Sequence, residues 1–210
     1  IVQPSDRIQI SDLDLRVPHS DRTLLTQLSL VIEPQQNLLI TGESGTGKSS
    51  LLRAIAGLWQ TNGGHIHLPD RLMFLPQTPY LIPGSIREQL QYPSSSGFSD
   101  QNLLQILRRV NLEYLFSSPD DLDNATANLS AGERQRIAVG RVLLHQPDFA
   151  FLDEATSALD LANEHQLYAQ LEQSQTTLIS VGHRDSLRRY HYRELRLKSA
   201  GDWSLEAIAP

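Results

Sequence analysis

The eight residues 42–49 have the composition of a phosphate-binding loop. They follow the pattern G-x-x-x-x-G-K-[ST] at every fixed position. Glycines let backbone N–H groups curl around phosphate oxygens, and a following helix adds the positive end of its dipole. Lys48 would place a positive charge on the β and γ phosphates, and Ser49 would offer a hydroxyl to Mg²⁺. The predicted phosphate-binding residues are Gly42, Glu43, Ser44, Gly45, Thr46, Gly47, Lys48, Ser49 and Ser50.

Two carboxylates follow the apolar run 149–152. In phosphoryl-transfer sites an aspartate at such a strand end holds Mg²⁺ opposite the loop hydroxyl, and Asp153 fits that role. A glutamate one residue further on can orient and deprotonate the attacking water, so Glu154 is the predicted catalytic carboxylate. Taken alone, the pair could equally cap a strand; the upstream loop favours the catalytic interpretation.

Two polar residues at other expected strand ends could complete the site. Gln77 follows the apolar run 73–75, where a neutral amide can accept from the catalytic water or ligate Mg²⁺. His183 follows the run 177–181, where its N–H could bind the γ-phosphate and steady the water. Each residue alone would more often be a surface or structural group.

The segment Ser130-Ala131-Gly132-Glu133 opens a strong helical pattern and has the sequence of a capping box. The small residues after Ser130 would leave the helix start bare, which predicts a second anion site at Ser130 and Gly132. Two helix starts of one chain cannot easily reach the same γ-phosphate. Two copies paired head to tail can, so the pattern predicts a partner of the same kind.

Hydrophobic periodicity predicts the elements that must position these residues. Residues 7–17 alternate apolar and polar with one slip between 10 and 13, which indicates a half-buried strand with a bulge. Gly57 is the expected stop of the helix after the loop. The other expected strands are 24–32, 38–41, 65–68, 73–75, 149–152, 177–181 and a closing hairpin of 195–197 with 203–205; the expected helices are 49–57, 86–90, 103–107, 130–145 and 161–171.

The composition changes after the first five expected strands. Residues 78–128 carry four prolines and a serine run among helical periods, which indicates a helical lobe inserted between strands of the main sheet. We therefore expect a core lobe of residues 1–77 and 147–210 and a helical lobe of residues 78–146.

The bulk composition excludes several classes of protein. The 210 residues carry a net charge of -6, so the electrostatic footprint of a nucleic-acid binder is missing, and no nucleic-acid partner is expected. There are no cysteines, which removes disulfides, thiolate metal sites and cysteine nucleophiles. No run approaches 18 consecutive apolar residues. The chain begins with Ile1 rather than methionine, and we expect a piece of a longer protein, although processing would look the same.

In this order the motifs resemble the nucleotide-binding domain of ABC (ATP-binding cassette) transporters, and the match covers almost the whole chain. The loop is similar to Walker A, the stretch 129–133 to the signature, the stretch 149–154 to Walker B with its catalytic glutamate, and 157–160 to the D-loop. Gln77 and His183 take the places of the Q-loop and H-loop residues.

Three stretches, 74–80, 152–160 and 179–184, are more particularly similar to one branch of the family. That branch holds the peroxisomal fatty acyl-CoA transporters and the bacterial peptide and cobalamin transporters similar to them. In it the ATPase domain follows a transmembrane domain on the same polypeptide.

The resemblance implies an α/β fold: a P-loop NTPase (RecA-like) core with an N-terminal antiparallel β subdomain and an inserted α-helical subdomain. It implies ATP and Mg²⁺ as ligands, and ATP hydrolysis that drives transport. The expected partners are a second copy, in a head-to-tail dimer holding two ATPs, and a transmembrane domain contacted through residues 77–87, where Tyr80 is a plausible anchor. The expected location is the cytoplasmic face of a membrane, in a bacterium the inner membrane.

The chain departs from the family pattern at two places. Ala131 stands in the signature where glycine is commoner, a sterically mild change. No Phe, Tyr or Trp occurs before Trp59, although the family usually stacks adenine on an aromatic residue upstream of the loop. The corresponding neighbourhood offers Val17, Pro18 and His19. We expect the base to pack on Val17 or Pro18 with weak selectivity.

Two other functions remain open from the residues. A non-transport ATPase of the same family, acting on DNA or ribosomes, would want a basic surface and usually two cassettes, and neither is present. A regulatory module that only binds nucleotide would be expected to lose Glu154 or His183, and the chain retains both.

Overall fold

The computed structural model describes residues 6–17, 20, 22–94, 97–124 and 128–208, which form two compact units. Unit 1 holds the described residues of 1–74, 148–153 and 177–210, and unit 2 holds those of 75–147 and 154–176. This division differs from the expected lobes, because residues 154–176 group with the helical unit. Their helix α5 (Leu161–Glu172) is joined to it by side-chain bonds: Arg109 Nε donates to Gln170 Oε1 at 2.7 Å.

Unit 1 contains a six-stranded sheet in the order β5-β6-β7-β3-β8-β9. Strands β6, β7, β3 and β8 pair in parallel, and β9 is antiparallel to β8 as the predicted closing hairpin. Strands β6 and β7 are buried along their whole length, which matches their continuous apolar sequences. The strand bounds are β3 (Leu38–Gly42), β5 (Leu72–Leu75), β6 (Phe149–Asp153), β7 (Thr177–Val181), β8 (Arg193–Leu197) and β9 (Trp203–Ala207).

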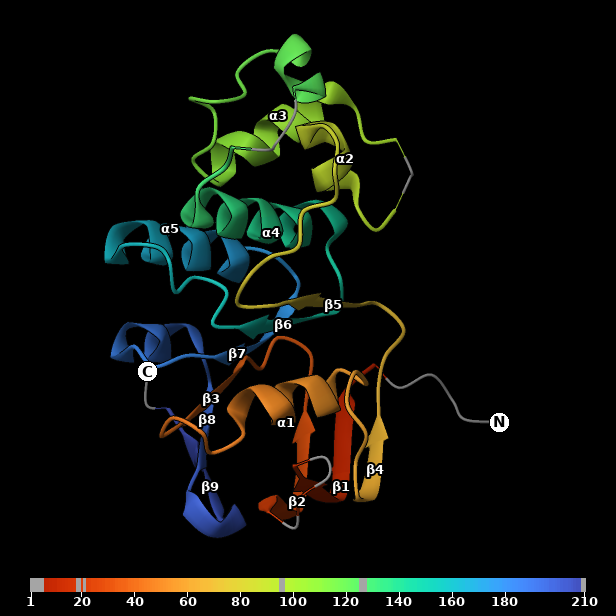
Figure 1. Ribbon diagram of the computed structural model, residues 1–210, viewed down its shortest axis with the longest axis vertical. Helices are drawn as coiled ribbons and strands as arrows, with labels where there is room; N and C mark the ends of the chain where they lie inside the picture. The colour runs from red at the N-terminus through yellow and green to blue at the C-terminus, as the bar shows by residue number, and fades with distance from the viewer. Residues whose placement is uncertain (1–5, 18–19, 21, 95–96, 125–127, 209–210) are drawn as a thin grey trace. The chain divides into compact units, whose positions relative to one another are not determined.

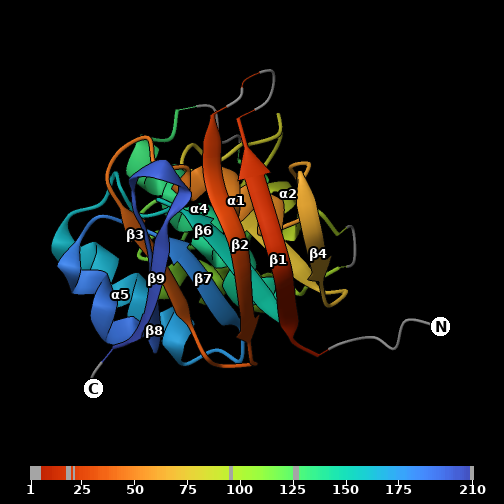
Figure 2. The same ribbon diagram turned by 90° about the horizontal axis from the view of Figure 1, so that it is seen from below.

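A second, antiparallel sheet of unit 1 has the order β2-β1-β4, with β1 (Ile8–Arg16) between β2 (Thr23–Ile32) and β4 (Gly63–His67) (Figure 2). The predicted bulge is present, because the pairing register shifts between Ile10 and Leu13. The sheet shares one hydrophobic core with helix α1 (Lys48–Ile55). The expected antiparallel β subdomain is confirmed.

Unit 2 is helical (Figure 1). Helix α4 (Ala131–His145) packs against α2 (Ile86–Gln91), α3 (Asp100–Arg109) and α5. Helices α2, α3 and α4 are capped by Ser85, Ser99 and Ser130, respectively. Each serine side chain accepts a hydrogen bond from the backbone N–H three residues further along the chain. Shorter 3₁₀ segments are η1 (Pro119–Asp123) in this unit, and η2 (Asp185–Tyr190) and η3 (Ser199–Gly201) in unit 1.

None of the helices in the described part of the chain has the length and apolar character needed to cross a bilayer.

Unit 1 contains a buried histidine with hydrogen bonds at both ring nitrogens. His191 is 5% exposed, its Nδ1 lies 2.8 Å from the Leu187 carbonyl and its Nε2 lies 2.9 Å from Ser180 Oγ. A carbonyl only accepts, so Nδ1 carries the proton and Nε2 accepts from the hydroxyl of a neutral ring. Burial lowers the pKa of His191 to about 4, although the bond to Leu187 acts in the opposite direction.

We expect the free energy of unfolding to fall as the pH is lowered from 6.5 to 4. In that interval the unfolded chain binds a proton at His191 that the folded chain does not, so this contribution is complete above pH 6.5. It amounts to on the order of 3 kcal/mol. Chemical denaturation across this pH range measures it. His191→Gln should flatten the pH dependence, whereas His65→Gln, at an exposed position of β4, should not. Equal slopes in the two variants would contradict the assignment.

Candidate nucleotide site

The phosphate-binding loop connects the end of β3 to the start of α1, as its sequence predicts. Its backbone requires glycine at two points. Gly42 has φ 139°, and a Cβ there would overlap the Leu197 carbonyl oxygen. Gly47 has φ 97°, and its Cβ would lie 3.2 Å from Leu24 side-chain atoms. Glycine at these two positions lets the loop backbone pack closely against Leu197 and Leu24.

Lys48 holds its ammonium group over the loop. Its side chain is largely buried, and Nζ donates to the carbonyl oxygens of Gly42 at 2.9 Å and Glu43 at 2.8 Å. These bonds fix a positive charge at the start of the loop, whose other end leads into the N-terminus of α1. Fixed cations and backbone N–H groups are the donors that phosphate oxygens require. The loop thus fits a phosphate chain.

Ser49 and Asp153 meet although they are 104 residues apart. Ser49 Oγ donates to Asp153 Oδ1 at 2.6 Å, and Arg53 Nη2 contacts Asp153 Oδ2 at 3.3 Å. Asp153 ends β6 and is 2% exposed. One hydroxyl and one carboxylate suit Mg²⁺, which keeps several water or phosphate ligands. No group of three or more His, Asp or Glu among the described residues could hold a metal by itself.

In unit 2, Gln77 contacts the predicted catalytic carboxylate. Gln77 Nε2 donates to Glu154 Oε2 at 2.7 Å. Glu154 has φ 49°, in the left-handed region that non-glycine residues rarely occupy, and such backbone conformations concentrate at functional sites. The amide of Gln77 thus orients Glu154, a contact that the sequence does not predict. The expected roles of Gln77 toward water or Mg²⁺ stay predictions.

The start of α4 has the predicted capping box. Ser130 Oγ accepts from Glu133 N at 3.3 Å, and Ser130 N donates to Glu133 Oε2 at 2.6 Å. Burial alone would raise the pKa of Glu133, but the hydrogen bonds from Tyr114 and Ser130 outweigh it, so the pKa lies below its ordinary value. This carboxylate accepts from the N–H of the N-cap residue Ser130, and the predicted anion site at Ser130 and Gly132 stays a prediction. A Cβ at Gly132 would lie 3.2 Å from Leu159 Cδ2, so that side of the helix start is packed.

His183 and the phosphate-binding loop line one pocket of unit 1. The pocket has a volume of about 590 Å³, and its lining includes Gly42, Glu43 and Thr46 of the loop together with His183. Two motifs separated by more than 130 residues in the sequence are thus brought to one cavity. The predicted role of His183 at the γ-phosphate remains a prediction.

Val17 lies at the end of β1, where it is half-buried and packs against the core cluster of unit 1. Val17 N donates to the Arg22 carbonyl at 3.0 Å. Pro18 and His19, the other candidates for the base, lie outside the described residues.

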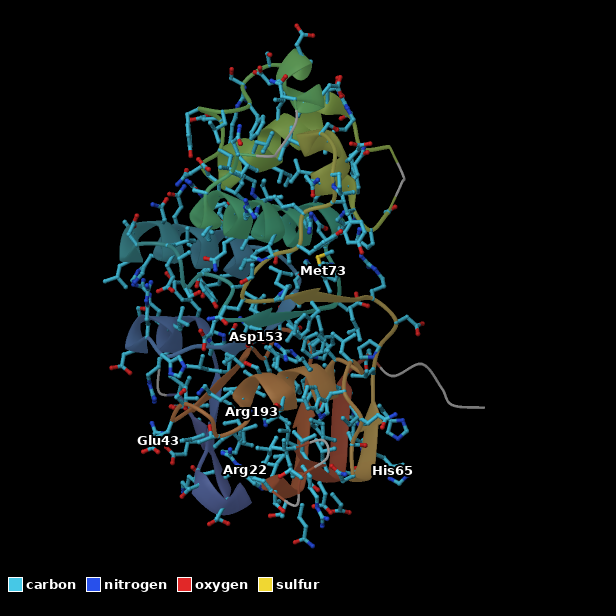
Figure 3. The ribbon with its side chains drawn as sticks, viewed as in Figure 1. Arg22, Glu43, His65, Met73, Asp153 and Arg193 are labelled. Carbon is cyan, nitrogen blue, oxygen red and sulfur yellow. The ribbon has the colours of Figure 1, made fainter. Side chains whose placement is uncertain are left out.

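Sequence reasoning missed two side chains that hold these motifs in place. Arg22 Nη2 donates to the Gly45 carbonyl at 2.7 Å. Figure 3 labels Arg22 together with the loop residue Glu43, both in the lower part of the view. In unit 2, the buried Gln135 donates to the Gln77 carbonyl and to Ser157 Oγ and accepts from Ala158 N. No local pattern marks either residue, because both act through contacts distant in sequence.

Comparisons with known proteins identify a family and several relatives of this chain. The family described as ABC transporter matches residues 25–157. An uncharacterized ABC transporter ATP-binding protein of Synechocystis sp. is 49% identical over 96% of this chain and 31% of its own length. The lysosomal cobalamin transporter ABCD4 of Homo sapiens is 39% identical over 98% of this chain and 37% of its own length. The ABC transporter D family member 2, chloroplastic, of Arabidopsis thaliana is 35% identical over 98% of this chain and 37% of its own length.

The chain spans about a third of the length of these relatives. Within that third lie the phosphate loop, the carboxylate-ended strand and the capped helix whose geometry is described above. The chain belongs to the ABC transporter family, as one of its ATP-binding ATPase domains.

Proposed function

We propose that this chain binds Mg²⁺-ATP at the loop 42–49 and hydrolyses it to drive transport by the complete protein. The observation that carries the proposal is the bond between Ser49 Oγ and Asp153 Oδ1, beside the tethered ammonium of Lys48. A hydroxyl, a carboxylate and a fixed cation at one loop are the groups that phosphoryl transfer uses. Basic surface for DNA or ribosomal RNA is missing from a chain of net charge -6.

Each residue of the proposed site has a separate role in ATP binding or hydrolysis. Lys48 and the loop N–H groups bind the β and γ phosphates, and Ser49 and Asp153 would hold Mg²⁺, which neutralises charge on the phosphate oxygens. Glu154, oriented by Gln77, accepts the proton of the attacking water. His183 donates to the γ-phosphate from the pocket that it shares with the loop. Because Lys48, Ser49 and Asp153 are held by bonds within unit 1, little reorganisation of these three groups opposes the reaction.

We propose that a second copy completes the site head to tail. Ser130 and Gly132 of that copy would offer the start of α4 to the γ-phosphate, so that ATP joins the two domains and its hydrolysis releases them. The capping box supports the proposal by fixing the conformation of this helix start. The dimer trap described in the Discussion tests it.

The partner in the membrane is proposed to dock on residues 77–87, on the cytoplasmic side of a membrane, in a bacterium the inner membrane. Tyr80 supports this surface because it is 68% exposed within the 77–87 segment. A photo-crosslinker placed at Tyr80 of the complete protein should label membrane-embedded sequence, and one placed at Tyr192, which is 62% exposed in unit 1, should not. Labelling only from the control position would contradict the docking surface.

The choice of nucleotide tests the site directly. If the base packs on Val17, which offers no hydrogen-bonding side chain, adenine and guanine should be discriminated weakly. Titration calorimetry with the complete protein should give dissociation constants for Mg²⁺-ATP and Mg²⁺-GTP within about threefold of each other. A strong preference for ATP would contradict the Val17 assignment, and binding of neither nucleotide would contradict the proposed function. Release of phosphate on longer incubation separates an ATPase from a module that only binds.

A further inference from the structure

A buried carboxylate lies in the wall of the pocket that contains His183. Glu194 on β8 is 3% exposed. Its Oε1 accepts from Thr41 Oγ1 at 2.6 Å and from Arg196 Nη2 at 3.1 Å, and its Oε2 accepts from Arg188. The carboxylate therefore has three donors from three separate places in the sequence. Neither the phosphate loop nor the predicted catalytic residues are among them.

Two of the donors lie directly beside functional motifs. Thr41 is the last residue before Gly42, at the point where β3 enters the phosphate loop. Arg188 belongs to η2, the 3₁₀ segment that begins two residues after His183. Thr41, Arg188 and Glu194 line the same pocket as Gly42 and His183. One side chain thus connects the entry of the loop with the segment that follows the histidine.

Separating Glu194 from Thr41 or Arg188 is energetically costly because the carboxylate is buried. A buried carboxylate is stable only while its partners remain in place, because removal of one leaves an uncompensated charge or an unsatisfied acceptor. Burial alone would raise the pKa of Glu194, but the bonds from Thr41 and Arg196 and the charge of Arg188 outweigh it, and the pKa lies below its ordinary value. The group is therefore ionised at neutral pH, and movement of η2 or of β3 would break a charge-assisted bond.

We infer that Glu194 is a positioning residue of the nucleotide site: its carboxylate holds the entry of the phosphate loop and the His183 segment in one arrangement. The inference rests on the proposed function. It assigns different consequences to the two bonds. The Thr41 bond positions the loop and so supports nucleotide binding, whereas the Arg188 bond positions His183 and so supports turnover.

The test uses the complete protein and measures the dissociation constant for Mg²⁺-ATP and kcat separately. Thr41→Val, which keeps the shape and removes the donor, should weaken binding by about tenfold with a smaller change in kcat. Thr41→Ser keeps the hydroxyl and should bind ATP several-fold more tightly than Thr41→Val. Arg188→Met should lower kcat by about tenfold with the dissociation constant within about twofold of the wild-type value.

Glu194→Gln should change both quantities. In that background Thr41→Val should have a smaller effect than in the wild type, because the shared acceptor is already altered. If Glu194→Gln does not fold, the contrast between the Thr41 variants and Arg188→Met still decides, since each of those variants keeps the carboxylate.

A matched control separates positioning from stability. Asn37 directly precedes β3 and bonds to two other elements: Nδ2 donates to the Tyr190 carbonyl of η2 at 2.9 Å, and Oδ1 accepts from Leu178 N of β7. Asn37→Ala should lower the melting temperature without the split between binding and turnover. Equal losses in Asn37→Ala and Glu194→Gln at matched melting temperature would overturn the inference, as would variants of Thr41 and Arg188 with the same kinetic profile. Failure of the wild-type protein to bind ATP would instead overturn the proposed function, and the inference with it.

Discussion

Glu154→Gln is expected to slow ATP turnover by about two to four orders of magnitude while leaving ATP binding intact. The amide cannot accept the proton of the attacking water, but it removes none of the groups that hold the phosphates. The backbone at Glu154 and its contact with Gln77 place the side chain without help from the loop. Single-turnover phosphate release and equilibrium binding, measured on the same preparation, separate the two effects.

The same variant should accumulate a nucleotide-bound dimer, because binding joins two copies and the step that separates them is blocked. Size-exclusion chromatography with and without Mg²⁺-ATP measures the shift. Glu172→Gln, which removes an exposed carboxylate at the end of α5 in the same unit, is the control and should behave as wild type. Rapid hydrolysis by Glu154→Gln would remove Glu154 from its proposed role, and full turnover without dimer formation would refute the head-to-tail site.

Lys48→Ala is expected to abolish measurable turnover and to weaken nucleotide binding by on the order of a hundredfold. The substitution removes the fixed positive charge at the β and γ phosphates and also the two bonds that hold the loop carbonyls of Gly42 and Glu43. Titration calorimetry with Mg²⁺-ATP measures the first effect. Arg108→Ala removes a positive charge from an exposed position of α3 in unit 2 and should retain binding. Unchanged turnover in Lys48→Ala would contradict the assignment of the loop.

Local signals in the sequence predicted most of the elements that the structure contains. The slip in alternation between residues 10 and 13 predicted the bulge of β1, and Ser130 with Glu133 predicted the capping box of α4. The loop glycines predicted the turn between β3 and α1, where Gly42 and Gly47 have backbone angles that favour glycine. Each of these signals spans a few residues, so a single sequence can carry it.

The remaining features depend on contacts between residues far apart in the chain. Arg22 bonds to Gly45, and Gln135 joins Gln77 to the segment after Glu154, yet each is an ordinary polar residue in its own neighbourhood. The grouping of residues 154–176 with the helical unit likewise depends on bonds from Arg109 and Asn111 to α5. The roles assigned to Glu154, His183 and Ser130 stay predictions, because they concern a nucleotide and a second copy.

The burial of Lys48 also bears on chemical labelling. The chain has only two lysines, and their amines differ sharply: Lys198 is exposed, whereas the Lys48 side chain is largely buried and its ammonium is held by two carbonyls. An acylating reagent should therefore modify Lys198 quickly and Lys48 slowly. Mass spectrometry of the modified peptides would measure the rate of Lys48 acylation. That rate reports how often the Lys48 amine leaves the two carbonyls and becomes exposed to solvent.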